Sequence, residues 1–363
     1  VLETVRFWLE RGVDGFRLDT VNYYFHDRRL RDNPPLKRSK GNDVPETNPY
    51  GYQDHVYDKS QPENISFLRR FRALLGEYGA HAAVGEVGDG DRSLETVANY
   101  TAGADLLQMC YTFDLLGPEF SAAHVRKCIE GFENTVRDGW VCWSLSNHDV
   151  PRHASRLTQK NENPERTARF AILLLAALRG SICLYQGEEL GLEEAEIAYE
   201  DLRDPYGIRF WPAFKGRDGC RTPMVWEHDA LNAGFSTGKP WLPIPAAHVA
   251  AAVDVQERNA DSVLAWYRRV LAVRSESSAL RTGTLRFLPS PRDVLAFERR
   301  SDHEALLCCF NFGDREARVE LRDVAGEAVL FVGEQSVRGG RMTLGGRSAV
   351  VVSLGQATRE GRA

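Results

Sequence analysis

The sequence has no cysteine pair at the spacing of a metal-binding or redox motif. Its seven cysteines are an odd number, spread from Cys110 to Cys309, and no two of them form a Cys-x-x-Cys pair. This pattern excludes a zinc site of the usual spacing and argues against a disulfide framework. Because free thiols persist in reducing compartments, the cysteine content predicts a cytoplasmic protein.

Long apolar runs and blocks of basic residues are missing as well. No run reaches the roughly 18 apolar residues that a membrane span needs. The longest, residues 170–178, lies between Arg169 and Arg179. The net charge is −5, and no block of Lys and Arg is interleaved with aromatic residues. We therefore expect neither a membrane nor a nucleic acid as a partner.

The first residue is not Met, and no signal-peptide pattern follows it. The chain opens directly in an amphipathic segment, residues 1–10, that predicts a helix. A chain that opens within a helix is typical of a fragment, so we expect this sequence to be N-terminally truncated.

Helical and strand patterns alternate from residue 1 to residue 190. Helices are predicted at 1–10, 62–78, 92–100, 119–136 and 164–178, with a later one at 261–275, and strands at 13–19, 82–86, 106–111, 141–146 and 181–185. Such alternation predicts an α/β fold of parallel units, which a doubly wound sheet and a TIM barrel both satisfy.

Two long segments lack this alternation. Residues 27–63 are rich in Pro, Asn, Asp and Tyr, and ordered loops of this length are usually functional. Residues 192–253 are predicted to be irregular, whereas residues 284–354 alternate as antiparallel strands do. We therefore predict two domains, a catalytic β/α domain at 1–277 and an all-β domain at 278–363.

Ionisable side chains stand at the ends of three predicted strands. Arg17 and Asp19 fall on one face of the first strand, because side chains alternate along a strand. Glu86 ends the second strand, and His148 and Asp149 follow a later one. A single Asp after a strand is usually a helix cap or a loop residue. Carboxylates that recur at the carboxyl ends of three strands are, however, typical of barrel enzymes.

Paired carboxylates in a cleft suit glycoside hydrolysis. One attacks the anomeric carbon and the other protonates the leaving oxygen, and in retaining enzymes the two lie about 5–5.5 Å apart. Arg17 beside Asp19 favours an anionic carboxylate, as a nucleophile requires. The general acid must instead stay protonated near neutral pH. Tyrosines in the segment 27–63 offer sugar rings flat surfaces for stacking.

At these residues the chain resembles glycoside hydrolase family 13, the α-amylase superfamily. The resemblance rests on five motifs in order: DGFRLD at 14–19, GE at 85–86, SNHD at 146–149, YQGEELG at 185–191 and GRDGCRTPMVW at 216–226. The last motif is similar to that of the oligosaccharide-cleaving subgroup, which includes the α-glucosidases. The resemblance implies a (β/α)8 TIM barrel with a small C-terminal antiparallel β-sandwich domain.

The resemblance also implies catalytic roles. Asp19 would be the nucleophile and Glu86 the general acid/base. Asp149 would be the third carboxylate, which holds the 2- and 3-hydroxyls of the sugar. The implied function is that of a retaining, exo-acting α-glucosidase that forms a covalent glucosyl-enzyme intermediate.

Further residues are implied to bind the sugar. Arg17 and His148 would contact it at the cleaved position. Arg217 would close the glucose pocket, with Arg221 the more structural of the two arginines. In the resembling enzymes, Val after the nucleophile goes with α-1,6 bonds and Ala or Thr with α-1,4 bonds. Thr20 therefore implies short, maltose-like substrates.

Three alternatives share part of this pattern. An α-glucosyl transferase would use the same catalytic residues. A non-catalytic relative, such as the heavy chain of an amino-acid transporter, typically lacks the carboxylates and carries a membrane helix, whereas all three carboxylates are present here. A phospho-sugar hydrolase would need a basic phosphate pocket. Lys37, Arg38 and Lys40 lie in the 27–63 loop, where a charged solvated loop is the simpler explanation.

Counted from the nucleophile motif as the fourth strand, the chain supplies barrel strands four to eight. The first three strands are missing, and with them the early loop that binds a divalent cation in several relatives, so we expect no metal or cofactor in this chain. An open barrel exposes two edges and a core face. We therefore expect this polypeptide alone to fold poorly or to be inactive. The expected partner is a small oligosaccharide, bound by a monomer or homodimer.

Overall fold

The computed structural model describes residues 1–37, 48–79, 81–136, 139–160, 162–320, 326–338 and 341–354. Arg38, Lys40 and the end of the expected all-β domain after residue 354 lie outside the described residues. The chain divides into two compact units, residues 1–117 with 127–144 and residues 118–126 with 145–363.

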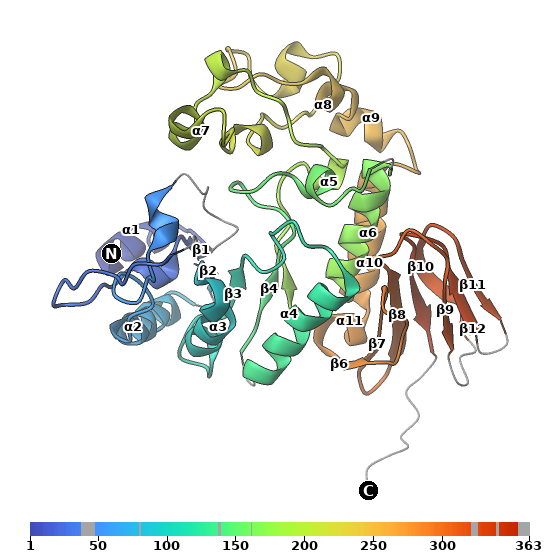
Figure 1. The fold of residues 1–363 in the computed structure, drawn as a ribbon, viewed down its shortest axis with the longest axis horizontal. Helices are drawn as coiled ribbons and strands as arrows, with labels where there is room; N and C mark the ends of the chain where they lie inside the picture. Colours follow the sequence, from blue (N-terminus) through green and yellow to red (C-terminus); the bar gives the residue numbers. More distant parts are fainter. Residues whose placement is uncertain are drawn as a thin grey trace, which may run out of the picture. The chain divides into compact units, whose positions relative to one another are not determined.

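The first unit is built of β/α repeats, as the sequence predicts. Its elements in chain order are α1 (Leu2–Leu9), β1 (Gly15–Leu18), α2 (Glu63–Glu77), β2 (Ala82–Val87), α3 (Ser93–Thr101) and β3 (Met109–Thr112). β1, β2 and β3 pair in parallel in that order (Figure 1). The register sets Arg17 beside Val84 and Glu86 beside Tyr111, so polar side chains collect where the strands end.

The helix α2 shows how this unit is held together. Leu68, Phe71 and Leu75 are buried and recur every three or four residues, which places them on one helix face. The ring of Phe71 meets that of Phe16 in β1 edge to face, with 6.1 Å between the ring centroids. Burying an apolar side chain of this size contributes about 1.5–3 kcal/mol.

A further repeat brings β4 to the edge of this sheet. The helix α4 (Ala122–Thr135) precedes β4 (Cys142–Trp143), and a parallel bridge from Cys110 to Val141 sets β4 next to β3. Phe132 of α4 packs on Trp143 edge to face, at 5.9 Å between centroids.

The second unit begins with helices. They are α5 (His153–Arg156), α6 (Pro164–Ala177), α10 (Val263–Glu276) and α11 (Ser278–Thr282), with the short strand β5 (Ser181–Ile182) after α6. Asn163 caps α6 by accepting from the backbone N of Glu165. α10 lies beside α6 (Figure 1), where Trp266 Nε1 donates to the carbonyl of Arg169 at 3.1 Å.

The prediction of an irregular segment at 192–253 was wrong in part. It contains α7 (Pro205–Phe210) and α8 (Ala246–Ala250), and α9 (Val253–Glu257) begins at its end. The sequence carries a start signal for α7, because Asp204 accepts from the backbone N of Tyr206 and Pro205 follows it at the first helical position.

Two antiparallel sheets form the C-terminal part. The five-stranded sheet has the order β10-β13-β8-β7-β6 and the three-stranded sheet the order β11-β12-β9. The strands are β6 (Thr284–Phe287), β7 (Val294–Arg300), β8 (Ala305–Asn311), β9 (Ala317–Glu320), β10 (Ala328–Val332), β11 (Gln335–Arg338), β12 (Arg341–Leu344) and β13 (Ala349–Ser353). Antiparallel strands were predicted for this region.

Side chains of both sheets share one apolar cluster. Val294, Leu307 and Val350 of the larger sheet pack with Val319 and Met342 of the smaller one. The larger sheet is also joined to the helical part, because the buried guanidinium of Arg299 donates to the carbonyls of Ala177, Leu280 and Gly283.

Candidate active site

The residues of the first predicted motif lie at the end of β1. Arg17 is in the strand, and Asp19 follows the last strand residue, Leu18. Glu86 lies in β2, one residue before its end at Val87. The predicted strand ends therefore differ from the observed ones by one residue, and both carboxylates still stand where neighbouring parallel strands finish.

Arg17 joins these two carboxylates. Its Nη1 donates to Asp19 Oδ1 at 2.7 Å, and its Nη2 lies 2.8 Å from Glu86 Oε2. The Asp19 side chain is 69% exposed, whereas that of Glu86 is 3% exposed. One guanidinium therefore holds an accessible carboxylate and a buried one close together.

Tyr111, which the sequence reasoning did not single out, completes this cluster from β3. Its phenol donates to Glu86 Oε1 at 2.7 Å and accepts from Arg17 Nη2 at 2.8 Å. Burial raises the pKa of Tyr111, and the charge of Glu86 raises it further, so the phenol stays a donor. The parallel pairing of β2 with β3 was the signal that could have found this residue.

Thr20 has an unusual backbone. Its φ of 41° and ψ of 48° fall in the left-handed region, which a β-branched residue rarely adopts. In this conformation its backbone N donates to Glu86 Oε2 at 3.1 Å. Strain of this kind costs about 1–3 kcal/mol and tends to occur at functional sites.

Arg17 stays a cation in this cluster. Burial lowers its pKa, but the hydrogen bonds to Asp19 and Tyr111 outweigh that effect and raise the pKa above its ordinary value. The guanidinium can therefore stabilise negative charge on both neighbouring carboxylates.

The other predicted residues belong to the second unit. Asn147 shapes the loop, because its Oδ1 accepts from the backbone N of Asp149 at 2.9 Å and of Val150 at 3.1 Å. His148 Nε2 lies 3.4 Å from Asp149 Oδ2. The SNHD motif thus folds into a tight turn that presents the side chains of His148 and Asp149 together.

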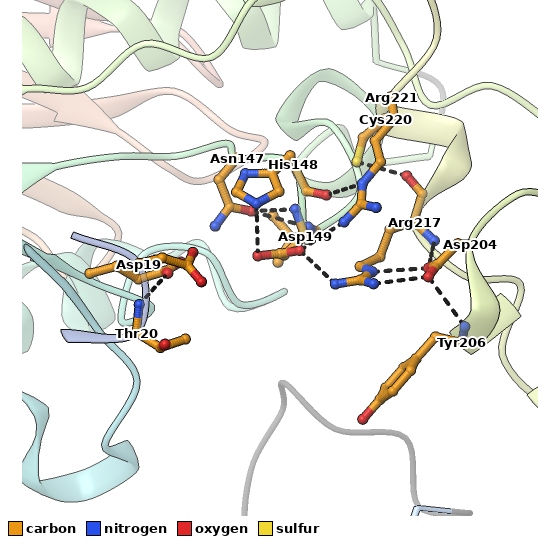
Figure 2. Close-up of polar contacts among 12 residues, drawn as sticks. Asp19, Thr20, Asn147, His148, Asp149, Asp204, Tyr206, Arg217, Cys220 and Arg221 are labelled. Carbon is orange, nitrogen blue, oxygen red and sulfur yellow. Dashed lines mark hydrogen bonds and ion pairs between the residues drawn. The ribbon is translucent and has the colours of Figure 1, made fainter. Parts of the chain in front are cut away.

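Both arginines of the last motif reach Asp149 (Figure 2). Arg217 Nη1 donates to Asp149 Oδ1 at 2.8 Å, and Arg221 Nη2 donates to the same oxygen at 2.9 Å. Arg221 Nε also donates to the carbonyl of His148 at 2.7 Å. Arg221 therefore contacts the same carboxylate as Arg217 in addition to supporting the loop backbone.

Asp204 was also missed by the sequence reasoning. It accepts from Arg217 Nε and Nη2, both at 2.9 Å. Burial raises the pKa of Asp204, but its hydrogen bonds with Arg217 and with backbone N–H groups outweigh this and lower the pKa. The hydrogen bonds with Asp204 raise the pKa of Arg217, against the opposing effect of burial. The pair is therefore ionised.

A buried arginine supports the loops around this carboxylate. Arg152, which is 1% exposed, donates from Nη1 to the carbonyl of Gln186 at 2.7 Å and from Nη2 to that of Cys220 at 2.9 Å. Its backbone N donates to Glu194 Oε2 at 2.8 Å. Three loops of the second unit are thus joined at one residue.

Within the described residues, we find no group of three or more His, Cys, Asp or Glu side chains arranged to hold a metal ion. The expectation that the chain needs no cofactor stays a prediction. No helix in the described part of the chain is long and apolar enough to cross a bilayer.

Residues 1–283 match the family described as "Alpha amylase, catalytic domain". A probable alpha-glucosidase of Rhizobium meliloti (strain 1021) is 52% identical over 324 residues, which make up 88% of this chain and 59% of that protein. An oligo-1,6-glucosidase of Parageobacillus thermoglucosidasius is 26% identical over 355 residues, or 89% of this chain and 61% of that protein.

A similar solved structure is that of XgtA, an alpha-glucosyl transfer enzyme. It matches with a TM-score of 0.90 and 47% identity, over 97% of this chain and 66% of that one. The chain thus spans between 59% and 66% of the length of these three relatives.

Proposed function

The chain belongs to the α-amylase family of glycoside hydrolases, and on this premise we propose that the whole protein is a retaining, exo-acting α-glucosidase. It would remove terminal α-linked glucose from short substrates through a covalent glucosyl-enzyme intermediate. The 52% identity to a probable alpha-glucosidase supports this proposal, and so does the family match over residues 1–283.

One observation within the first unit carries the proposal. Arg17 holds Asp19 and Glu86 with its two terminal nitrogens, at 2.7 Å and 2.8 Å. A single planar guanidinium can bind two carboxylates only when these lie near each other. The two carboxylates are thereby close enough to act on one glycosidic bond, as the proposed mechanism requires.

The proposed steps use these two residues in turn. Asp19 attacks the anomeric carbon while Glu86 gives its proton to the leaving oxygen, and an ester to Asp19 forms. Glu86 then takes a proton from water, whose oxygen displaces Asp19 and releases glucose with its original anomeric configuration. Asp149 would bind the 2- and 3-hydroxyls of the sugar in both steps.

Further roles are proposed for the neighbouring residues. Arg17 would keep Asp19 anionic, and His148 would bind the sugar at the cleaved position. Arg217 would close the pocket, so that the enzyme removes single terminal residues. Thr20 favours α-1,4-linked substrates such as maltose over α-1,6-linked ones.

Transfer of glucose to an alcohol or a second sugar is the second candidate. The specific support is the 47% identity to an enzyme described as transferring α-glucosyl groups. Both reactions share the glucosyl-enzyme intermediate and differ in whether water or another hydroxyl group attacks it.

The proposal also covers the architecture of the whole protein. β1 to β5 would be strands four to eight of a (β/α)8 barrel, with residues 1–277 in the catalytic domain. Residues 278–363 would form the β-sandwich domain. A cytoplasmic location, a small oligosaccharide as the substrate and a monomeric or dimeric state stay predictions.

The test is to follow the anomeric form of the first product by NMR, with the full-length protein and with maltose and isomaltose in parallel. The glucose released from the non-reducing end is expected as the α-anomer, so the product should hold more α-glucose than the reducing ends of the substrate supply. An excess of β-glucose over that amount would contradict retention. Repeating the reaction with added glycerol separates the candidates, because a transferase would form glucosyl-glycerol and one glucose from each maltose, whereas hydrolysis releases two glucoses.

The Asp19→Asn variant extends this test. It should lose nearly all turnover, and residual activity above roughly 1% would argue against Asp19 as the nucleophile. The matched control is Asp14→Asn, because Asp14 belongs to the same motif and precedes β1. This control should retain most of the activity.

A further inference from the structure

Arg217 lies between the carboxylates of Asp149 and Asp204 in the second unit, and most of its hydrogen bonds go to Asp204. Asp204 Oδ1 accepts from Arg217 Nη2, and Asp204 Oδ2 accepts from Nε and from the backbone N of Arg217, each at 2.9 Å. Arg217 Nη1 points the other way and donates to Asp149 Oδ1 at 2.8 Å (Figure 2). Two of the three guanidinium nitrogens, Nε and Nη2, therefore donate to Asp204.

Asp204 is itself fixed in place. Its side chain is fully buried, and it caps α7 by accepting from the backbone N of Tyr206 at 3.2 Å. Its backbone N donates to Asp218 Oδ2 at 2.8 Å, and Asp218 is 1% exposed. Hydrogen bonds thus hold both the side chain and the backbone of Asp204. The buried carboxylate therefore cannot follow Arg217 if that side chain moves.

The backbone sets the distance between the two residues. A Cβ atom added to Gly216, whose φ is +83°, would lie 2.7 Å from the Cα of Gly207, closer than such contacts allow. The segments before Arg217 and after Asp204 therefore touch without side chains between them. Only glycine fits here, both because of this contact and because of the positive φ.

This arrangement limits how Arg217 can bind Asp149. A free guanidinium prefers to bind a carboxylate with two nitrogens. With Nε and Nη2 held by Asp204, Arg217 has Nη1 for Asp149 Oδ1, the oxygen that Arg221 also contacts. The second oxygen, Oδ2, lies 3.4 Å from His148 Nε2 and is left for another donor.

We propose that Asp204 is a positioning residue that keeps Asp149 able to bind the sugar. By limiting Arg217 to one hydrogen bond with Asp149, it prevents a two-nitrogen pairing that would occupy both oxygens of Asp149. This inference rests on the proposed function, in which Asp149 holds sugar hydroxyls.

The test uses Asp204→Asn in the full-length protein. Asn caps a helix as well as Asp does, so α7 should persist. Its amide carries no charge and offers one acceptor in place of two, so Arg217 is released toward Asp149. We expect kcat/KM for maltose to fall by roughly tenfold or more, a loss of about 1.4 kcal/mol per factor of ten. The affinity for glucose should fall in parallel.

A second background separates positioning from a purely structural role. Arg217→Met has no guanidinium that could pair with Asp149, so adding Asp204→Asn to it should lower kcat/KM further by less than about twofold. An equal loss in both backgrounds would overturn the proposal. The control is Asp201→Asn, an exposed acid of the same segment, which should leave kcat/KM unchanged.

The outcomes also distinguish this inference from the proposed function. If the wild-type protein cleaves no α-glucoside, the proposed function is wrong. If the wild type is active and the Asp204→Asn variant is equally active, only the inference about Asp204 is wrong. If the variant does not fold, a crystal structure of the wild type with glucose decides the question. Oδ2 of Asp149 bound to the sugar supports the proposal, and two Arg217 nitrogens on Asp149 overturn it.

Discussion

The phenol of Tyr111 donates to Glu86 Oε1 at 2.7 Å, while Arg17 Nη2 donates to that phenol at 2.8 Å. The hydroxyl of Tyr111 therefore links Glu86, the proposed acid/base, to Arg17 by hydrogen bonds, and Arg17 also holds Asp19. It fixes one oxygen of Glu86, and Arg17 and the backbone of Thr20 hold the other.

Tyr111→Phe removes this hydroxyl and keeps the ring. A hydrogen bond to a charged group contributes about 1.5–3 kcal/mol, so kcat should fall by roughly 10- to 100-fold, with a smaller change in KM. The measurement is steady-state kinetics of the full-length protein on maltose. Tyr100→Phe is the matched control, because Tyr100 is a buried tyrosine whose hydroxyl accepts from Asn64. A kcat that stays at the wild-type value would show that the hydroxyl does not position Glu86.

Thr20→Val should shift the linkage preference. The two side chains have nearly the same shape, but Val lacks the hydroxyl and presents a methyl group beside Asp19. We expect kcat/KM for isomaltose to rise relative to kcat/KM for maltose. The ratio should rise by roughly tenfold if the Thr20 side chain contributes about 1.4 kcal/mol to the discrimination between the two linkages. Thr20→Ala should keep the preference for maltose. An unchanged ratio in Thr20→Val would mean that linkage is chosen elsewhere.

The sequence predicted the strands at whose ends the candidate site residues lie. It did not predict the residues that hydrogen-bond to these side chains. Asp19, Glu86 and Asp149 were predicted because a carboxylate recurs at the ends of three of the predicted strands. Tyr111 was missed because its link to Glu86 depends on the register of β2 against β3, which local patterns do not reveal. The predicted carboxyl ends of β1 and β2 were correct to within one residue.

Asp204 and the contact of Arg221 with Asp149 were not predicted, for a different reason. Both act over long sequence separations, 13 residues from Asp204 to Arg217 and 72 from Asp149 to Arg221. The segment between 192 and 253 has little periodicity, so its short helices were predicted to be irregular chain. Contacts of this kind depend on how loops pack, and a capping signal such as Asp204-Pro205 gives only the start of a helix.

Arg152→Met should destabilise the protein. It removes the donors to the carbonyls of Gln186 and Cys220, although Tyr185 still donates to the latter at 3.0 Å. A buried acceptor left without a donor costs about 1–3 kcal/mol, so we expect a loss of roughly 2–4 kcal/mol in the free energy of unfolding. Urea denaturation measures it.

A matched control for Arg152→Met is Arg209→Met, which changes an exposed arginine on α7. It should alter the free energy of unfolding by less than about 0.5 kcal/mol. Equal effects of the two substitutions would contradict the view that Arg152 joins the loops of the second unit.

Glu194 should make stability depend on pH near neutrality. Burial raises its pKa from 4.5 to about 7, although the backbone N–H and the charge of Arg152 and the charge of Arg156 oppose the rise. The folded state therefore binds the proton more tightly than the unfolded state does. The stability that this proton contributes is complete below pH 4.5 and is lost as the pH rises through 7.

Glu194→Gln isolates this effect, because Gln has the same shape and no charge, and its oxygen can still accept from the backbone N of Arg152. At pH 8 the variant should have a higher Tm than the wild type, and the difference should shrink toward pH 5, where the wild-type carboxyl is protonated in the folded state. Glu200→Gln changes an exposed acid of the same segment, and it should show no such trend. A Tm difference for Glu194→Gln that is equal at pH 5 and pH 8 would mean that this carboxyl does not take up a proton in that range when the protein folds.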